Sequence, residues 1–508
     1  MSKSQSKYFL RLERGPTRSG SGRSRRVGWL VCLILVACTL PPAELPQPAI
    51  QTTPLPTATS APEATPFPTR PPYNPGELVD YTAQTGDTLP ALAVRFNTTI
   101  PEILTANPNI PGDATTMPPG MPMKIPIYYL PLWGTPFQIL PDWHFVNGPA
   151  ALAFDTQAFV ETQPGWLKDF NAYVAGETRS GAGIVDYVAR NFSVGPRLLL
   201  AVLDYQTGAL TNPAQPGNLD EYPLGYVNGN NRGLYLQLVA AANQLNHGYY
   251  GWRAGELPDF ELLNGELERP DPWQNAGTVA IQHYFAGFMG AAAYREAISP
   301  EGIAAVYQNL FGDPWADPTP HLPGSLRQPA FQLPFEPGKP WTYTGGPHTG
   351  WGTGAPYAAL DFAPPSVKAG CLESEDWATA IAAGVVARSE TGIVVLDLDG
   401  DGDERTGWNI FYLHLATKDR VTVGTALAAG EPVGHASCEG GTSTGSHIHI
   451  ARKYNGEWVL ASGTLAFDLE GWIAQDGADA YLGTLTRGSR VITACECSNR
   501  ASQIISGE

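Results

Sequence analysis

The chain has 508 residues, of which 43% are hydrophobic, so it is long enough for several domains with their own apolar cores. Its formal net charge is −17, which argues against a nucleic-acid-binding protein because such proteins need a basic surface. The 47 prolines and 55 glycines indicate many turns and at least one linker.

Residues 1–38 are predicted to be a signal peptide with a lipobox. A basic stretch precedes an apolar run over 27–37, which is too short for a membrane span of about twenty residues. The sequence Leu35-Val36-Ala37-Cys38 resembles a bacterial lipobox, which would make Cys38 the lipidated first residue of the mature protein. The alternative is ordinary cleavage nearby. We expect an extracytoplasmic protein, either anchored by lipid to the outer face of the bacterial cytoplasmic membrane or secreted.

Residues 39–77 are rich in Pro, Thr and Ala and contain few large apolar side chains. Such a composition cannot bury a core and favours extended polyproline conformations. We therefore expect a linker that carries the rest of the chain away from the membrane.

Residues 78–128 predict a small α+β unit. A strand begins near Val79, Gly86-Asp87 turns the chain, two short helices follow, and 123–127 returns as a strand. The unit resembles a LysM domain, and the resemblance implies binding to the N-acetylglucosamine chains of peptidoglycan. The matching residues are Tyr81, Gly86-Asp87-Thr88-Leu89, Asn107-Pro108 and 120–126.

Residues 135–320 are predicted to be mainly helical, with good stretches at 184–191, 196–205, 234–245 and 278–289. The segment 188–210 resembles the region around the catalytic acid of lysozyme-like transglycosylases, with Asp204 where that family has a glutamate. A glycosidic acid needs a carboxyl in an apolar pocket that raises its pKa. Because the aspartate side chain is shorter, we interpret this region as a degenerate glycan-binding or spacer module, with catalysis by Asp204 as the alternative.

Residues 335–475 are Gly-rich, and short β-type runs alternate with Gly, Pro and Asp clusters, which predicts an antiparallel all-β domain. Residues two apart in a strand share a face, so His447 and His449 should point into one site. His414 lies near the end of another strand, and His348 and Asp361 lie upstream. Neutral imidazole and carboxylate are ligands that zinc prefers in catalytic sites.

These motifs closely resemble the lysostaphin-type (LytM-like) peptidoglycan zinc metallopeptidases over nearly the whole C-terminal domain. The resemblance implies one zinc ion bound by His348, Asp361 and His449, with His414 and His447 as the catalytic pair. Twelve residues separate His348 from Asp361, where family members commonly have three, so this insertion has to loop out.

The other histidines have ordinary interpretations. His435 is expected to be a neighbour of the site, whereas the remaining four are expected to be core or surface residues: His144, His247, His283 and His321. The acidic run 397–404 imitates the start of an EF-hand loop, but Trp408 stands where the bidentate glutamate belongs. We therefore favour an acidic hairpin tip over a calcium site.

Four cysteines follow the export signal, and disulfides persist outside the cytoplasm. Their pairing cannot be read from the sequence, although Cys371–Cys438 is favoured because both flank the metallopeptidase motifs; the other two are Cys495 and Cys497. The role of residues 476–508 stays open. The sequence thus predicts a wall-directed zinc endopeptidase that cleaves peptide cross-links of peptidoglycan. The alternatives are a non-catalytic wall-binding or hydrolase-activating protein and a glycan-cleaving enzyme centred on Asp204.

Overall fold

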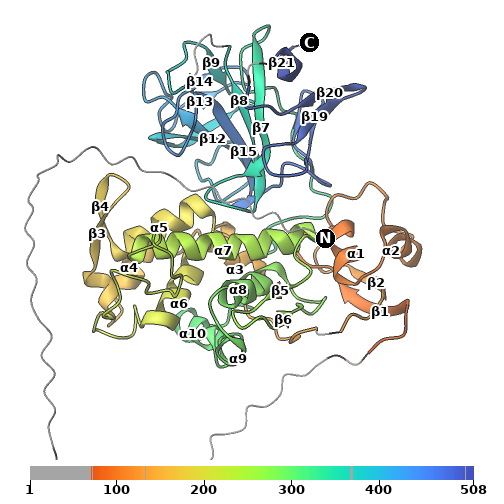
Figure 1. Ribbon diagram of the computed structural model, residues 1–508, viewed down its shortest axis with the longest axis vertical. Coiled ribbons are helices and arrows are strands. Elements are labelled where there is room, and N and C mark those ends of the chain that lie inside the picture. The colour runs from red at the N-terminus through yellow and green to blue at the C-terminus, as the bar shows by residue number, and fades with distance from the viewer. Residues whose placement is uncertain (1–69, 71, 132, 366–369, 498, 508) are drawn as a thin grey trace, which may run out of the picture. The chain divides into compact units, whose positions relative to one another are not determined.

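The computed structural model describes residues 70, 72–131, 133–365, 370–497 and 499–507 (Figure 1). The predicted signal peptide, most of the predicted linker and Cys38 lie outside these residues. Within the described residues, no helix combines the length and the apolar character needed to cross a membrane.

The LysM-like unit (78–128) is a two-stranded sheet with two helices. Thr88 caps the first helix through its side chain, and Thr99 forms a capping box with Glu102 at the second. The two strands pair antiparallel, with Val79 opposite Ile125. The elements are β1 (Glu77–Thr82), α1 (Leu89–Arg95), α2 (Ile100–Ala106) and β2 (Pro122–Ile127).

The middle region is built from helices around one apolar cluster, with two short hairpins at its surface. The predicted helices are all present, and the longest continues well beyond the predicted stretch 234–245, to the left-handed Gly255. The helices are α3 (Asp142–Phe145), α4 (Thr156–Glu161), α5 (Gly181–Phe192), α6 (Pro196–Thr207), α7 (Leu234–Ala254), α8 (Ala276–Ala286), α9 (Ala291–Ala297) and α10 (Ile303–Phe311). The hairpins are β3 (Asn171–Val174) with β4 (Glu177–Ser180) and β5 (Phe260–Glu261) with β6 (Leu267–Glu268).

The C-terminal region is built on an antiparallel sheet with the strand order β13-β10-β11-β12-β15-β8-β7-β21, and β16 pairs with β15. Its strands are β7 (Pro340–Thr349), β8 (Tyr357–Ala363), β10 (Gly384–Glu390), β11 (Gly392–Asp397), β12 (Trp408–Leu415), β13 (Ala426–Leu427), β15 (Ile448–Tyr454), β16 (Glu457–Trp458) and β21 (Gln503–Ile505). The fold class predicted from the sequence is confirmed: a small α+β unit, a mainly helical region and an antiparallel β region.

The two faces of this sheet pack against different partners. Leu360, Tyr412 and Ile450 belong to a core that lies within the C-terminal region. Phe411 and Ala451, which point to the other face, belong to the same apolar cluster as the helices. One face of the sheet is therefore buried against the helical region.

Residues 476–497 and 499–507 complete the β region. β21 pairs with β7, with Ile504 opposite Trp341. A separate four-stranded sheet has the order β17-β18-β19-β20. Its strands are β17 (Asp468–Leu469), β18 (Trp472–Gln475), β19 (Thr484–Arg487) and β20 (Arg490–Thr493). A two-stranded sheet joins β9 (Trp377–Thr379) and β14 (Pro432–His435).

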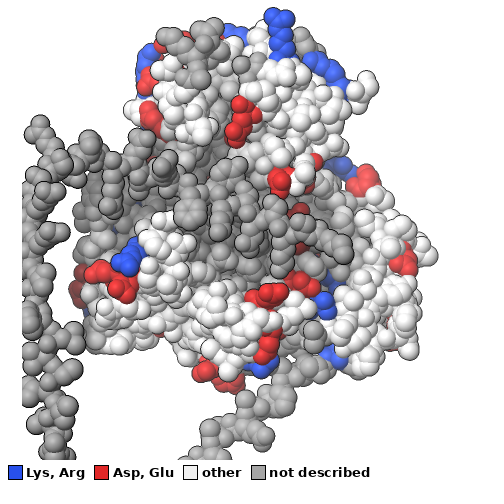
Figure 2. All heavy atoms as spheres, viewed as in Figure 1, with Lys and Arg blue, Asp and Glu red and all other residues white. Residues whose placement is uncertain are grey.

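Figure 2 shows where charged side chains lie on one face of the molecule. On the face drawn in Figure 2, acidic and basic groups lie in small separate groups, and lysines and arginines do not gather into one patch among the described residues.

Candidate metal centre

Four neighbouring strands carry the predicted site residues. In the order β12-β15-β8-β7, these strands contain or end at His414, His449, Asp361 and His348 respectively. Asp361 stands directly opposite His449 in the register, and His449 stands opposite Leu413. His447 lies immediately before β15, in an isolated bridge with Ser437. The sheet thus brings together residues that are far apart in the sequence.

The three predicted ligands converge on one point. His348 Nε2 lies 3.0 Å from His449 Nδ1 and 3.2 Å from Asp361 Oδ1, and His449 Nδ1 lies 3.3 Å from the same oxygen. All three residues are buried. Zinc bonds of about 2.0–2.1 Å in a tetrahedral site would place ligand atoms about 3.3 Å apart, which agrees with these distances.

The chemistry of these atoms also fits a metal ion. His449 Nε2 donates to the carbonyl of Gly350 at 3.0 Å, so its Nδ1 carries a lone pair. Asp361 Oδ1 is buried with no hydrogen-bond donor. Two acceptor atoms, His449 Nδ1 and Asp361 Oδ1, share this buried point with His348 Nε2, and a cation there would satisfy them, because buried polar groups without a partner are costly. The residues therefore fit zinc.

The insertion between His348 and Asp361 forms a hairpin, as the sequence required. β7 continues to Thr349 and β8 starts at Tyr357, so only the tip of the insertion is irregular. In the register His348 stands opposite Ala359 and Gly345 opposite Asp361. The unusual spacing therefore leaves the two ligands on adjacent strands with their ligand atoms in contact range.

His414 and His447 lie beside the ligands with one ring nitrogen of each held by a carbonyl. His414 Nδ1 is 2.9 Å from the carbonyl oxygen of Glu439, and His447 Nδ1 is 2.8 Å from that of Gly445. The two rings are 4.6 Å apart, and His447 Nε2 lies 3.6 Å from Asp361 Oδ2. Donation from Nδ1 leaves each Nε2 as the nitrogen that can accept a proton.

The backbone of β12 is irregular at His414. Its φ is +63°, a left-handed conformation that a non-glycine residue adopts at a cost, and the pairing with β11 shifts between Gly392 and Val394. Such bulges redirect side chains next to functional sites. The surrounding sheet therefore supports a strained histidine that is aimed at the ligands.

Burial and neighbouring charges act on two groups of the site. Burial favours protonation of Asp361, but His348 and His447 outweigh that effect and hold the pKa of its carboxyl well below the usual value. Burial, together with His447 and His449, lowers the pKa of His414 to about 3. His414 is therefore neutral at neutral pH and offers a lone pair.

Sequence reasoning missed Tyr481, which comes from the segment after β18. Its ring stacks on His348 with the centroids 4.1 Å apart and a 25° angle between the planes. Its backbone N–H donates to the carbonyl of Pro347 at 3.1 Å, and its φ is +70°. No motif marks this residue, because only the pairing of the C-terminal segment with the sheet brings it to the site.

The disulfides complete the loops of the β region. Cys371 is bonded to Cys438 and Cys495 to Cys497, which settles the pairing that the sequence left open. The backbone N–H of Ser446 donates to the carbonyl of Gly370 at 3.2 Å, next to Cys371. The first disulfide therefore lies beside the loop that leads into His447.

Asp204 is placed as a structural residue. Its Oδ1 accepts hydrogen bonds from Leu210 N–H at 2.8 Å and from the N–H and hydroxyl of Thr211 at 3.1 and 3.0 Å. These bonds close the turn after α6 and engage the carboxylate oxygen with the protein's own chain rather than with a substrate. The geometry thus disfavours the alternative that Asp204 cleaves glycans.

The acidic run forms the loop between the antiparallel strands β11 and β12. Carboxylate oxygens of Asp397, Asp399 and Asp401 lie within 4.8 Å of one another. Burial, with a contribution from Asp399, raises the pKa of Asp397 to about 6. Asp403 pairs with Arg405 at 2.6 Å. The location agrees with the favoured hairpin tip, and the calcium alternative is untested.

The other histidines contact residues outside the ligand set. His435 stacks on Trp377 at 3.8 Å in the β9–β14 sheet, and His321 contacts Glu457 at 2.5 Å. His144, His247 and His283 belong to the helical region, where burial lowers the pKa of each.

Comparisons with known proteins agree with this geometry. The family model described as "LasA, N-terminal domain" matches residues 138–325, and the model described as "LysM domain" matches 81–126. The first of these matches relates the helical region to the LasA N-terminal domain, whereas the predicted lysozyme-like relationship is not shown.

Two enzymes are similar to parts of this chain. The chain is 25% identical to protease LasA of Pseudomonas aeruginosa strain UCBPP-PA14 over 343 residues, or 64% of the chain and 75% of the relative. It is 32% identical to beta-lytic metalloendopeptidase of Lysobacter enzymogenes over 135 residues, or 26% of the chain and 74% of the relative. Among solved structures, an M23 metalloprotease named pseudoalterin, from the deep sea, is 24% identical with a TM-score of 0.28 and covers 33% of the chain and 96% of that structure.

The identity over most of a beta-lytic metalloendopeptidase, together with the three convergent ligands, settles the relationship. The chain belongs to the M23 metalloendopeptidases of the LasA and beta-lytic type, with a LysM domain at its N-terminal side, and it is a zinc-dependent hydrolase of peptidoglycan cross-links.

Proposed function

We propose that His414 and His447 are the catalytic residues of a lipid-anchored cross-link endopeptidase. The observation that carries this assignment is the arrangement of their rings, 4.6 Å apart, with each Nδ1 held by a carbonyl beside the ligand cluster. The Nε2 atoms of His414 and His447 are not needed to complete the ligand set, which consists of His348, Asp361 and His449.

The roles follow from the positions of these atoms. Bound zinc supplies Lewis acidity toward the scissile carbonyl and the attacking water. His447 Nε2, 3.6 Å from Asp361 Oδ2, is placed to accept the proton of the attacking water. His414, held by the Glu439 carbonyl and with its ring 4.6 Å from that of His447, offers a lone pair at Nε2 and is placed to accept a proton and pass it to the leaving amine.

The remaining parts of the chain place this site at its substrate. We assign residues 1–38 to export, Cys38 to lipidation and 39–77 to a spacer that reaches from the membrane to the wall. The LysM domain, assigned to 78–128, holds glycan and so raises the local concentration of stem peptides. We assign residues 135–320 to the helical domain and 335–475 to the peptidase domain. The Pro/Thr-rich composition of residues 39–77 supports their assignment as a spacer.

The test separates catalysts from ligands. His414→Ala and His447→Ala should retain about one zinc per chain and lose hydrolysis of purified peptidoglycan by on the order of a hundredfold or more. His435→Gln, in a buried histidine of the same region that stacks on Trp377, serves as the control and should keep activity. Loss of zinc in either alanine variant would assign that histidine to the metal instead.

Product analysis tests the rival functions in the same digests. Peptide-bond hydrolysis frees amino groups, whereas cleavage at Asp204 would produce reducing or anhydro sugar ends. The absence of any new product from zinc-loaded protein would favour the non-catalytic wall-binding or hydrolase-activating alternative.

A further inference from the structure

The tip of the insertion between His348 and Asp361 rests on helix α7. The backbone N–H of Thr353 donates to Asn243 Oδ1 at 2.8 Å. Asn243 is held in turn by its own helix, because its Nδ2 donates to the Val239 carbonyl at 3.0 Å. Gly352 has a φ of +87°, and a side chain there would overlap Asn243 and Phe192. The tip is therefore fitted closely to the helical region.

The same tip orients a zinc ligand. The carbonyl of Gly350 accepts the hydrogen bond of His449 Nε2 at 3.0 Å, which fixes the imidazole with Nδ1 toward Asp361. The neighbouring Trp351 packs between Phe192 of the helical region and Phe411 of β12, with centroid distances of 6.5 and 5.8 Å. A hydrogen-bond partner of this kind sets the orientation and basicity of a ligating histidine.

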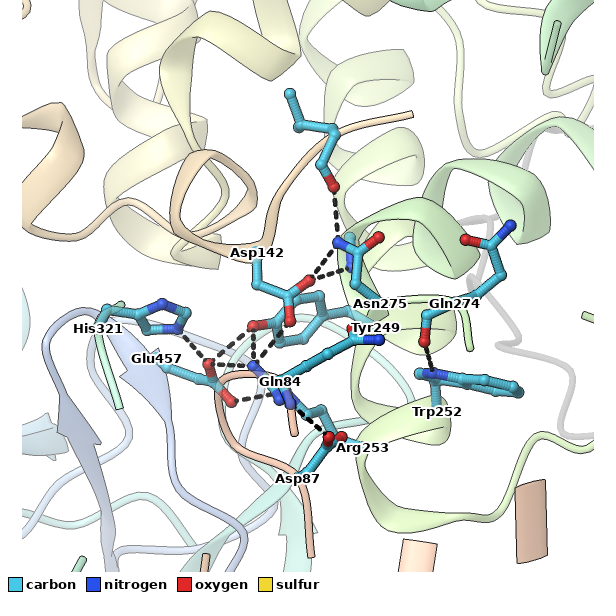
Figure 3. A network of polar contacts seen from close by, with 12 residues as sticks. Gln84, Asp87, Asp142, Tyr249, Trp252, Arg253, Gln274, Asn275, His321 and Glu457 are labelled. Carbon is cyan, nitrogen blue, oxygen red and sulfur yellow. Dashed lines mark hydrogen bonds and ion pairs between the residues drawn. The ribbon is translucent and has the colours of Figure 1, made fainter. Parts of the chain in front are cut away.

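A second set of contacts fixes the strand that carries His449. β16 pairs with β15, and the backbone N–H of Trp458 donates to Tyr250 of α7 at 3.0 Å. Glu457 accepts from the hydroxyl of Tyr249 at 2.7 Å and lies 3.3 Å from Arg253 Nε. Figure 3 shows these side chains of α7 and β16 meeting in one polar network, with Asp87 of the LysM domain close by.

We propose that α7 is a positioning element of the zinc site and that Asn243 is a positioning residue for His449. The helix holds His449 in two ways, through the β15–β16 hairpin and through the carbonyl of Gly350 on the insertion tip. Asn243 does not touch zinc or substrate. It fixes the tip, and the tip fixes the tautomer and orientation of the ligand.

A pair of matched substitutions tests this role in the full zinc-loaded chain. Asn243→Leu keeps the approximate volume of the side chain and removes the acceptor for Thr353. Asn191→Leu is the control, because Asn191 also donates to the carbonyl four residues earlier, at Tyr187, and also accepts from the β region, from Arg388 at 2.8 Å. Both variants lose one hydrogen bond between the helical and β regions, but only Asn243 contacts the insertion tip.

The readout is zinc affinity, measured by competition with a chromophoric chelator in the absence of substrate. Asn243→Leu should weaken zinc binding by about tenfold, the lower end of the range for partners that orient metal ligands. Asn191→Leu should leave zinc affinity within about twofold of the wild type, although it costs at least as much thermal stability because Arg388 is charged. Unchanged affinity in Asn243→Leu, or equal loss in both variants, would overturn the proposal.

Two glycines of the tip provide a second comparison that leaves α7 intact. Gly352→Ala and Gly354→Ala share the strain of a positive φ, +87° and +76° respectively. Only Gly352→Ala pushes against Asn243, since the nearest atom to a side chain at 354 is His247 Nδ1 at 3.4 Å. Zinc affinity should fall in the first variant and not in the second, and the reverse order would contradict the role of α7.

The inference rests on zinc binding by His348, Asp361 and His449 and does not depend on the roles proposed for His414 and His447. Because zinc affinity is measured without substrate, failure of the catalytic assignment would leave these results unchanged.

Discussion

Replacing Arg253 by methionine is expected to destabilise the whole folded unit from residue 70 onward. The guanidinium lies 3.2 Å from Asp142 Oδ2 and 3.3 Å from Glu457 Oε1, and it donates to Tyr249 at 2.8 Å. All three charged side chains are nearly inaccessible, at 6%, 4% and 6% exposed. The substitution leaves two buried carboxylates with one partner fewer (Figure 3).

The expected magnitude follows from burial. Removing one partner of a buried ion pair costs about 3–5 kcal/mol. Asp142 keeps bonds from Asn275 and Gly277, and Glu457 keeps His321, so the lower part of that range applies. With an unfolding entropy of about 2.1 cal/mol/K per residue over roughly 440 residues, this corresponds to a fall in Tm of about 3–5 °C.

The assay is thermal unfolding of the zinc-loaded chain, and Arg327→Met is the control. Arg327 pairs with Asp113 of the LysM domain at 3.1 Å, but the two side chains are 65% and 77% exposed. Such a pair contributes about 0–1 kcal/mol to the free energy of unfolding. The Tm of Arg327→Met should therefore differ from that of the wild type by less than about 1 °C. Equal shifts in the two variants would refute the argument from burial.

The pH dependence of the Arg253 effect provides an internal check. Burial favours protonation of Glu457, but Arg253 and His321 outweigh it and lower the pKa of the carboxyl. A depressed pKa stabilises the fold fully above the unfolded value of about 4.5, and this stabilisation is lost as the pH falls through the folded value. The difference in Tm between wild type and Arg253→Met should therefore narrow from pH 7 toward pH 3.

Three further outcomes are expected. Asp361→Ala should sharply lower zinc occupancy, measured by metal analysis, and full occupancy would mean that another residue takes its place. Deleting residues 79–127 should weaken hydrolysis of intact sacculi and spare a small soluble muropeptide at equal zinc loading; equal loss on both would show that the LysM domain supports the fold. Burial raises the pKa of Glu268 to about 7, so the fold loses stability as the pH rises from about 4.5 to 7, and Glu268→Gln should flatten this dependence in denaturation measured at pH 5 and 8.

The metal centre could be predicted because its motifs resemble those of the lysostaphin-type metallopeptidases and its residue types suit zinc. His447 and His449 are two apart at the start of a strand, and both reach Asp361, at 3.6 and 3.3 Å. The zinc ligands are the residue types that the metal prefers, and the antiparallel class of the domain followed from its short runs between turns. Neither the choice of zinc ligands nor the antiparallel class of the domain required knowledge of the strand order.

The features that escaped prediction depend on pairings between distant segments. Tyr481 reaches His348 only because the C-terminal segment returns to the sheet, and no pattern around it announces that return. The resemblance of the segment 188–210 makes Asp204 a candidate acid, but its carboxylate caps the following turn through Leu210 and Thr211. A side chain that bonds its own local backbone leaves the same sequence signal as a residue in an apolar pocket.

The insertion between the first two ligands shows how a departure from the family spacing can carry a function. A zinc site constrains only where ligand atoms meet, and the adjacent strands β7 and β8 satisfy that constraint whatever the length of the turn between them. The additional residues are therefore free to make contacts elsewhere. Here the backbone N–H of Thr353 donates to Asn243 on α7, and the carbonyl of Gly350 accepts from His449. A shorter turn could still place His348 beside Asp361, but it would lack the residues that connect the ligand to the helical region.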